Sequence, residues 1–353
     1  MATVPWFPGA GLVSRWSSAG KLASVPRHEE IEGIAVSHPR TLFIPRLAHT
    51  AWGPLYAASI APSLISLRLR GKFDVVLGSW AYPDGFAAVI AARLLGLPCV
   101  VKLHGSDINI IAKIPGPRML SAWALPQATK VVAVSRALAD EVEQLGVPRE
   151  NIAIVMNGVD ASLFHPRDRA AARRELGLPV DGRLALYVGN LKVEKGVLDL
   201  AAAWANVEIP AMLAIVGGGP AKAELEKAVA GMTNVKLVGP QPLSTIPTWL
   251  AACDVLVLPS HAEGTPNVVL EALACGRRVV ATSVGGIPDL ITSDTLGQLV
   301  PAREPKPLAV ALAHALSTPY SADEVARLGA RGGWDASAAT LHQVLLDASV
   351  RGS

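Results

Sequence analysis

Two carboxylates with seven residues between them are the first candidates for chemistry in this sequence. Glu263 lies in a loop-forming stretch, whereas Glu271 lies in an apolar run. Between them, Thr265 followed by Pro266 is typical of a helix start, with a side-chain cap and then proline at the first helical position. We expect the backbone N–H groups of that first turn to face a ligand, and the two carboxylates to bind different hydroxyls of one elongated ligand. The alternative is that Glu271 pairs with a buried arginine and Glu263 is an ordinary surface acid.

A lysine directly before a predicted helix is the second candidate. The run Tyr187-Val188-Gly189 indicates a strand that ends in a glycine turn, and Lys195-Gly196 stands at the start of the next helix. The partial positive charge of a helix N-terminus adds to that of an ammonium group, so this position suits a diphosphate. A solvated loop lysine is the alternative interpretation.

A histidine and an aspartate follow a further apolar run. His104 and Asp107 come directly after residues 99–103. An imidazole and a carboxylate at a strand end can transfer protons or bind hydroxyl groups. Alternatively, the histidine and the glycine after it simply end the strand.

The elements that must position these residues follow a regular pattern. Short apolar runs end in Gly, Ser or Pro, and each is followed by an Ala- and Leu-rich segment. Such alternation predicts βα units around a buried parallel sheet. The predicted strands form two series: 73–77, 99–103, 130–134 and 152–156, then 184–188, 212–216, 235–238, 255–258 and 278–281.

The two series predict an α/β protein with two doubly wound, Rossmann-like domains facing a cleft. We expect the first domain over residues 1–165, the second over 166–333, and a separate helix over 334–353 that packs back on the first domain. Open α/β sheets bind ligands outside the carboxyl ends of their strands, which is where the three candidate segments lie.

Composition narrows the class of protein. The 353 residues are 51% hydrophobic with a formal net charge of +3, which excludes a disordered chain. The three cysteines, Cys99, Cys253 and Cys275, are far apart, so we expect no disulfide framework and a cytoplasmic location. No secretory signal peptide is visible, and the longest apolar stretch, 53–67, is too short to span a membrane.

Positive charge is concentrated near the start of the chain. Residues 1–72 contain eight Lys or Arg and three Glu, a net charge of +5, beside the apolar helix predicted near 53–67. This favours peripheral contact with an anionic membrane at its inner face, with an ordinary solvated surface as the alternative. The excess is too small, and too poor in interleaved aromatic residues, to predict nucleic-acid binding.

The sequence predicts neither a metal site nor a dinucleotide site. It contains no Asp-x-Asp pair, no His-Glu-x-x-His motif and no P-loop motif. The cluster Gly217-Gly218-Gly219 follows a predicted strand, but no acidic residue for a ribose is clearly placed about 20 positions later. A dehydrogenase is therefore not favoured.

Taken together, these segments resemble the family 4 glycosyltransferases of the GT-B fold. The likeness covers residues 70–350, and the segment Trp80–Gly85 is most similar to members of the teichuronic-acid type, which make bacterial cell-surface polysaccharides. The motifs that carry it are Glu263-x7-Glu271, Tyr187-Val188-Gly189 with Lys195-Gly196, His104-Gly105-Ser106-Asp107 and Asn157-Gly158-Val159-Asp160.

The resemblance implies retaining, metal-independent transfer of a sugar from a nucleotide-sugar donor, with no further cofactor. It implies that Glu263 contacts hydroxyls of the donor sugar, Glu271 the donor ribose, and Lys195 the diphosphate leaving group. It also assigns the first domain to the acceptor and the second to the donor. The implied catalytic residues are His104, Asp107 and Glu263, and the implied donor-binding residues are Gly189, Asn190, Lys195, Gly264, Thr265, Asn267, Val268 and Glu271.

Two departures from the family pattern affect these expectations. Asn190 stands where the family usually has arginine, so one of two cations for the diphosphate is replaced by a neutral group. The start of the chain resembles a point well inside the family pattern, so we expect the first βα unit to be missing. For the same reason, we expect no proper strand before Gly9-Ala10-Gly11 and do not identify this segment with the family's glycine-rich loop.

We therefore expect a hexosyltransferase of bacterial envelope or exopolysaccharide synthesis, with a glycan or lipid-linked acceptor. Two alternatives stay open. A nucleotide-sugar epimerase of the same fold would change the donor without an acceptor. A non-catalytic nucleotide-sugar-binding protein, favoured by Asn190 and the missing unit, would bind the donor without turnover.

Overall fold

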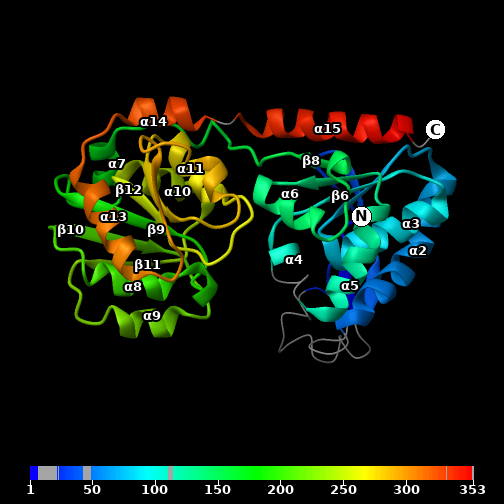
Figure 1. The fold of residues 1–353 in the computed structure, drawn as a ribbon, viewed down its shortest axis with the longest axis horizontal. Coiled ribbons are helices and arrows are strands. Elements are labelled where there is room, and N and C mark those ends of the chain that lie inside the picture. The colour runs from blue at the N-terminus through cyan, green and yellow to red at the C-terminus, as the bar shows by residue number, and fades with distance from the viewer. Residues whose placement is uncertain (7–21, 23, 43–48, 110–113, 331, 352–353) are drawn as a thin grey trace. The chain divides into compact units, whose positions relative to one another are not determined.

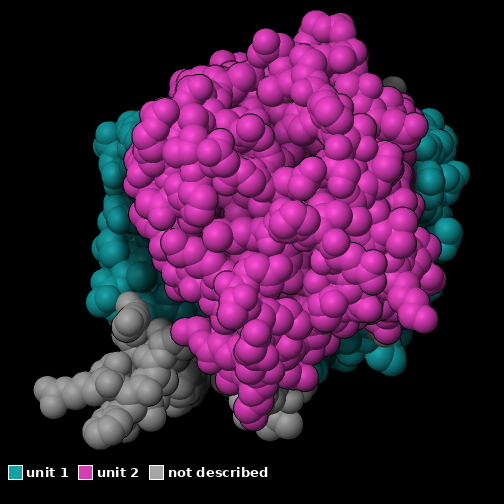
Figure 2. Space-filling model, turned by 90° about the vertical axis from the view of Figure 1, so that its left-hand side faces the viewer, with its two compact units in different colours: residues 1–133, 138–154, 341–353 teal, residues 134–137, 155–340 magenta. Residues whose placement is uncertain are grey.

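The structure is a computed structural model that describes residues 1–6, 22, 24–42, 49–109, 114–330 and 332–351. The chain divides into two compact units (Figures 1 and 2). Unit 1 comprises residues 1–133, 138–154 and 341–353, and unit 2 comprises residues 134–137 and 155–340.

Unit 1 is built around a four-stranded parallel sheet in the order β5-β6-β7-β8. Its strands are β5 (Val76–Ser79), β6 (Cys99–Lys102), β7 (Lys130–Ala133) and β8 (Ile152–Ile154). A parallel pair, β1 (Val4–Trp6) with β4 (Arg40–Leu42), and a hairpin, β2 (His28–Ile31) with β3 (Ile34–Ser37), precede it. The helices of this part of the chain are α2 (Trp52–Arg70), α3 (Phe86–Leu95), α4 (Ser106–Asn109), α5 (Pro115–Ala124) and α6 (Arg136–Glu143).

The expectation of no strand near the start of the chain was wrong. Residues Val4–Trp6 pair in parallel with Arg40–Leu42, and Val4 is buried. The proline at position 5 does not prevent this, because a strand at a sheet edge tolerates a residue without an N–H donor. The segment Gly9–Gly11 lies outside the described residues.

Unit 2 contains a six-stranded, fully parallel sheet in the order β11-β10-β9-β12-β13-β14. Its strands are β9 (Arg183–Val188), β10 (Ala211–Val216), β11 (Val235–Gly239), β12 (Val255–Leu258), β13 (Arg278–Thr282) and β14 (Gly297–Val300). Its helices are α7 (Arg169–Glu175), α8 (Val197–Trp204), α9 (Lys222–Ala228), α10 (Ile246–Ala252), α11 (Asn267–Ala274), α12 (Ile287–Leu290), α13 (Pro305–Ser317) and α14 (Ala322–Gly329), and α15 (Trp334–Arg351) follows.

Burial explains why the strands of unit 2 form where the apolar runs predict them. All four residues of β12 and all five of β13 are buried, as expected for central strands of a parallel sheet covered by helices. Helix α13 packs on β9, β12, β13 and β14, and α10 contacts β9 (Figure 1). Asp168 begins α7 by accepting a hydrogen bond from the Ala171 N–H at 2.6 Å. The predicted doubly wound α/β architecture is therefore confirmed.

Candidate functional site

The predicted lysine and one predicted glutamate meet at the point where the strand order of unit 2 reverses. The chain passes from β9 outward to β10 on one side, whereas β12 lies on the other side of β9. Lys195 follows β9, Glu263 follows β12, and their Nζ and Oε1 atoms are 2.7 Å apart. The Ser260 hydroxyl donates a second hydrogen bond, of 2.6 Å, to the same carboxylate oxygen. Such a switch point, outside the carboxyl ends of the strands, is where open α/β sheets bind ligands.

A glycine in the left-handed region fixes the position of Lys195. Gly196 has φ +67°, and a Cβ atom there would lie 1.9 Å from the Pro259 carbonyl oxygen. Only glycine permits both this conformation and this close approach. Gly196 therefore allows the loop after β9 to lie against the loop after β12. Lys195 remains 31% exposed, whereas the Glu263 side chain is only 9% exposed.

The glycine cluster after β10 supports the loop that contains Gly189 and Asn190. A Cβ atom on Gly217 would lie 1.9 Å from the Gly189 carbonyl oxygen, and one on Gly219 would lie 2.4 Å from the Leu191 carbonyl oxygen. The Gly189 N–H also donates to the Val216 carbonyl at 3.0 Å. The cluster thus has a packing role, in which missing side chains let two loops lie backbone to backbone.

The Asn190 side chain is exposed, while its backbone is held firmly. Its carbonyl accepts a 2.9 Å hydrogen bond from the hydroxyl of Tyr187, which is fully buried. Burial, assisted by the nearby Glu263 charge, raises the pKa of Tyr187. The Tyr187 hydroxyl therefore stays protonated and continues to donate to this loop.

The expected helix cap by Thr265 was wrong. Thr265 is buried, and its hydroxyl donates to the Val134 carbonyl instead of to the first turn of α11. Pro266 occupies the N-cap position, and Asn267 is the first helical residue. The Thr265 hydroxyl bonds to a residue far away in the sequence, and local helix propensity does not predict such an interaction. The helix start itself lies where it was predicted, within one residue.

Asn157 is a residue of this site that the sequence analysis did not assign. Its side-chain N–H donates to the Asn267 Oδ1 atom at 2.9 Å, and so holds the first residue of α11. Val268 follows in the same turn and is partly buried. The motif Asn157-Gly158 was noted only for its resemblance, because a pairing across 110 residues leaves no local pattern.

Two adjacent glycines, Gly285 and Gly286, are also part of the site. A Cβ atom on Gly285 would lie 1.8 Å from the Glu263 carbonyl oxygen, and the Gly286 N–H donates to the Gly264 carbonyl at 2.7 Å. They brace the backbone that bears Glu263. The sequence signal that could have found them is a glycine pair just beyond the end of β13.

Glu271 differs from Glu263 in having no charged partner. It is partly buried between Leu270 and Ala272, and no ion pair to it occurs among the described residues. Among these residues, therefore, no arginine pairs with Glu271 in the way that the alternative interpretation expected. Burial raises the pKa of Glu271 to about 7, because desolvation disfavours the charged carboxylate. Glu271 can thus change charge near neutral pH.

In unit 1, His104 lies beside an aromatic ring and a hydroxyl at the end of β5. Its Nε2 atom is 2.8 Å from the Ser79 hydroxyl, and its ring centroid is 5.4 Å from that of Trp80. Burial is the main cause that lowers the pKa of His104, opposed by the Asp107 charge and assisted by Lys102. The imidazole is therefore neutral at pH 7 and can accept or donate a hydrogen bond.

Trp80 was quoted in the sequence analysis only for its resemblance, yet its conformation is unusual. It has φ +76°, a region that a bulky residue rarely adopts, and the residue is 42% exposed. Its N–H donates to the Lys102 carbonyl at 2.8 Å, and its carbonyl accepts from the Gly85 N–H at 2.8 Å. Such strain persists where neighbouring contacts determine it, and it occurs often at ligand sites.

Asp107 is fully buried and holds the backbone of this region. Its carboxylate accepts hydrogen bonds from the N–H groups of Ala81 at 2.9 Å, Gly105 at 2.8 Å and His104 at 3.2 Å. It therefore joins the end of β5 to the end of β6. This geometry is that of a positioning residue, because its oxygens are occupied by the backbone.

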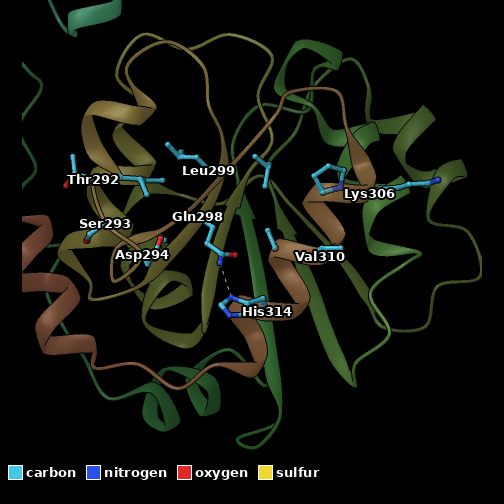
Figure 3. Close-up of a pocket in the computed structure, with 13 residues that line it drawn as sticks. Thr292, Ser293, Asp294, Gln298, Leu299, Lys306, Val310 and His314 are labelled. Atoms are coloured by element: carbon cyan, nitrogen blue, oxygen red, sulfur yellow. Dashed lines mark hydrogen bonds between the residues drawn. The ribbon is translucent and has the colours of Figure 1, made fainter.

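None of the predicted site residues lines a hollow of about 990 Å³ in unit 2 (Figure 3). It is lined by residues of β14, of α13 and of the segment before β14, with Gln298 donating to His314 at 3.0 Å.

Among the described residues, no cluster of three or more His, Cys, Asp or Glu side chains could hold a metal ion. Within the same residues, no helix has both the length and the apolar character needed to cross a bilayer.

Family models match both parts of the chain. Residues 20–163 match the model described as glycosyltransferase family 4, and residues 182–318 match glycosyl transferases group 1. A Bacillus subtilis protein, TuaC, assigned as a teichuronic acid biosynthesis glycosyltransferase, is 32% identical over 269 residues, covering 75% of this chain and 67% of the relative. A D-inositol 3-phosphate glycosyltransferase of Thermobispora bispora is 33% identical over 310 residues, covering 80% and 72%.

Solved structures agree at the level of fold. The Anabaena protein Alr3699/HepE, in complex with UDP, matches with a TM-score of 0.76 at 20% identity, over 98% of this chain and all of the other. Sucrose-phosphate synthase from Thermosynechococcus elongatus matches with a TM-score of 0.74 at 21% identity, over 92% and 86%. With the family matches, these likenesses show that the chain belongs to the family 4, or group 1, glycosyltransferases and has the GT-B fold.

Proposed function

We propose that this protein transfers a sugar, with retention of configuration and without a metal ion, from a nucleoside-diphosphate sugar to an acceptor hydroxyl in bacterial surface-polysaccharide synthesis. The observation that carries the proposal is the Lys195–Glu263 pair at the strand-order switch of unit 2. The relatives named above support the transferase activity, and retention is carried over from the family resemblance.

The charge of the leaving group explains how the Lys195–Glu263 pair would be used. A departing nucleoside diphosphate develops negative charge, and preformed cationic and N–H donors stabilise such charge most effectively. Lys195 is partly exposed and pairs with one carboxylate, so its ammonium group could bind a diphosphate in place of that carboxylate. Glu263, which still accepts from the Ser260 hydroxyl, would then also accept hydrogen bonds from the hydroxyls of the donor sugar.

The other donor contacts follow from the loops around this pair. We assign the ribose to Glu271, whose carboxylate has no charged partner among the described residues and can accept from both ribose hydroxyls. The backbone N–H groups of Gly264 and Val268 lie at the same strand ends and would bind the phosphates. The Gly189 N–H already donates to the Val216 carbonyl, so Gly189 would contribute only a close approach of its backbone. Asn190, which is exposed and neutral, would donate a hydrogen bond but no charge. Lys195 thus carries more of the phosphate binding than it would beside an arginine.

In unit 1 we assign the reacting sugar to His104 and give Asp107 a positioning role. A neutral imidazole can bind a sugar hydroxyl without attracting the diphosphate. Asp107 fixes the backbone N–H groups on which the orientation of His104 depends. Trp80 would present an aromatic face to a pyranose ring, since aromatic side chains combine a large apolar surface with a polar edge.

The test of the proposal uses UDP and UDP-glucose, because UDP is bound in a structural neighbour. Calorimetry should detect UDP binding, and proton NMR should show UDP-glucose consumed with the product linkage keeping the donor's anomeric configuration. Excess EDTA should leave both unchanged. An inverted product would contradict retention, and loss of turnover with EDTA would contradict metal independence.

Two outcomes would favour the alternative functions. Conversion of UDP-glucose into an isomeric nucleotide sugar without any acceptor would indicate an epimerase. Tight UDP-glucose binding with no turnover, even to water, across a panel of sugar and lipid-linked acceptors would indicate a binding protein. A thermal-shift screen of nucleotide sugars comes first, because a ligand at about 100 times its Kd stabilises the fold by about 2.7 kcal/mol.

A further inference from the structure

A histidine beside the proposed donor site joins the loop after β9 to the loop after β12, and the proposed function gives it no role. His261 lies in the loop that bears Glu263, and its Nε2 atom is 2.6 Å from the Oδ2 atom of Asp199. Asp199 belongs to the first turn of α8, the helix that begins just after Lys195. The contact therefore reaches across 62 positions of the sequence.

The backbone of His261 makes a second contact with the same part of the chain. Its N–H donates to the Glu194 carbonyl at 2.9 Å, directly before Lys195. His261 thus bonds to residues on both sides of Lys195, to Glu194 through its backbone and to Asp199 through its ring. Both contacts fix where the loop after β9 lies against the loop after β12.

His261 is itself held in place by the sheet. The preceding residue, Ser260, is fully buried, and its carbonyl accepts a hydrogen bond from the Thr282 hydroxyl of β13. The His261 side chain is 14% exposed and that of Asp199 is 26% exposed. A hydrogen bond to a carboxylate is stronger than a neutral one, and exclusion of water strengthens it further. This contact is therefore suited to hold one loop against the other.

The His261–Asp199 pair differs from the Lys195–Glu263 pair in what a ligand would do to it. If a diphosphate binds the Lys195 ammonium group, as proposed above, the bond from Lys195 to Glu263 weakens. The proposed function assigns no ligand atom to His261, Asp199 or the Glu194 carbonyl, so these contacts can persist while the donor is bound. They then determine the spacing between the cation for the diphosphate and the carboxylate for the sugar.

We propose that His261 and Asp199 are positioning residues, which keep Lys195 and Glu263 at the spacing that a nucleoside-diphosphate sugar requires. This role rests on the proposed function, because it needs a ligand that contacts both loops at once. Groups that are already aligned need no further ordering in the transition state. Loosening the loops should therefore lower turnover more than it lowers nucleotide affinity.

Hydrogen exchange tests the loop contact without any ligand. In His261→Ala and in Asp199→Ala, the backbone amides of residues 190–199 should exchange at least about fivefold faster than in the wild type, because the loop opens more often. His261→Gln keeps an N–H donor near the position of Nε2 and should restore slow exchange. The matched control is Glu224→Ala, which removes an acid from the first turn of another helix, α9, and should leave exchange in residues 190–199 unchanged.

Turnover of UDP-glucose, with the best acceptor of the panel above, tests the positioning role. In His261→Ala, kcat should fall about tenfold while the Kd of UDP rises less than about threefold. A contact that only stabilised the fold would lower the melting temperature and leave kcat of the folded protein unchanged. The double variant of His261→Ala and Asp199→Ala should lose no more than either single variant, to within about twofold, because both substitutions break one contact. His261→Gln should regain most of the turnover.

Exchange and turnover together separate this role from the proposed function. Unchanged exchange in His261→Ala, or unchanged kcat despite faster exchange, would overturn the positioning role. Additive losses of turnover in the double variant would also overturn it, since the two side chains would then act independently. If the wild type neither bound UDP nor consumed UDP-glucose, the proposed function would fail, while the exchange rates would still decide whether His261 and Asp199 hold the loops together.

Discussion

The candidate regions of the two units differ in their chemistry. In unit 2, Lys195 and Glu263 form a charge pair on two neighbouring loops, and glycines let those loops lie backbone to backbone. In unit 1, His104 is neutral and lies beside an aromatic ring, and the charges of Asp107 and Lys102 act on its pKa in opposite directions. A diphosphate requires charge, whereas a sugar requires neutral hydrogen-bonding groups and a flat apolar face. This is the difference that we expect if unit 2 binds the diphosphate and unit 1 the sugar, as proposed above.

The largest effect that we predict is on the stability of unit 1. Asp107→Ala leaves three N–H groups without this acceptor, two of them fully buried, so the free energy of unfolding should fall by about 3–5 kcal/mol in urea denaturation. Asp107→Asn keeps one oxygen and should lose less. The exposed acid Asp140 supplies the control, because Asp140→Ala should change stability by no more than about 0.5 kcal/mol. If Asp107→Ala were as stable as that control, Asp107 would not be a positioning residue.

The next effect is on nucleotide affinity. Lys195→Ala should weaken UDP binding by about 1.5–3 kcal/mol, the range for a charge-assisted hydrogen bond, while the fold is unchanged. Lys192→Ala, an exposed lysine of the same loop, is the matched control and should retain nearly full affinity. If UDP affinity fell equally in the two variants, Lys195 would contribute only general electrostatic attraction. Calorimetric titration measures both.

Burial accounts for which elements could be predicted from the sequence. Four consecutive apolar residues predict β12 at 255–258, where it is found, because central strands are buried on both faces. The strand β14 was missed, since Gly297 and Gln298 interrupt its apolar run at the sheet edge. The strand β1 was not expected, because the start of the chain resembles a point well inside the family pattern, yet Val4–Trp6 pairs with Arg40–Leu42.

The site was predictable in its residue types but not in its pairings. Lys195 and Glu263 were both identified, yet their contact spans 68 residues and depends on the strand order. The cap assigned to Thr265 failed because a distant carbonyl took its hydroxyl. The conformation of Trp80 could not be foreseen either, because a positive φ is normally expected only at glycine. Here it depends on the hydrogen bond that the Trp80 N–H donates to Lys102 of β6 and on the one that its carbonyl accepts from Gly85.

A smaller effect should appear in the pH dependence of donor binding. Because burial raises the pKa of Glu271 to about 7, its carboxyl is mainly neutral at pH 6 and mainly charged at pH 8. In the proposed contact the charged form would accept from both ribose hydroxyls, so UDP-glucose should bind about tenfold more weakly at pH 6 than at pH 8. In Glu271→Gln this dependence should disappear and the affinity should be low at both values. If the affinity of the wild type for UDP-glucose did not change with pH, the ribose would not be bound by Glu271.

The most direct test of the division between the two regions is UDP calorimetry on His104→Ala, with UDP-glucose turnover measured on the same preparation. We predict a UDP affinity within about twofold of the wild type, well under the 1.4 kcal/mol that corresponds to a factor of ten, together with loss of sugar transfer. This combination would separate nucleotide binding in unit 2 from sugar chemistry in unit 1. A loss of UDP affinity as large as that of Lys195→Ala, or undiminished transfer, would contradict the account.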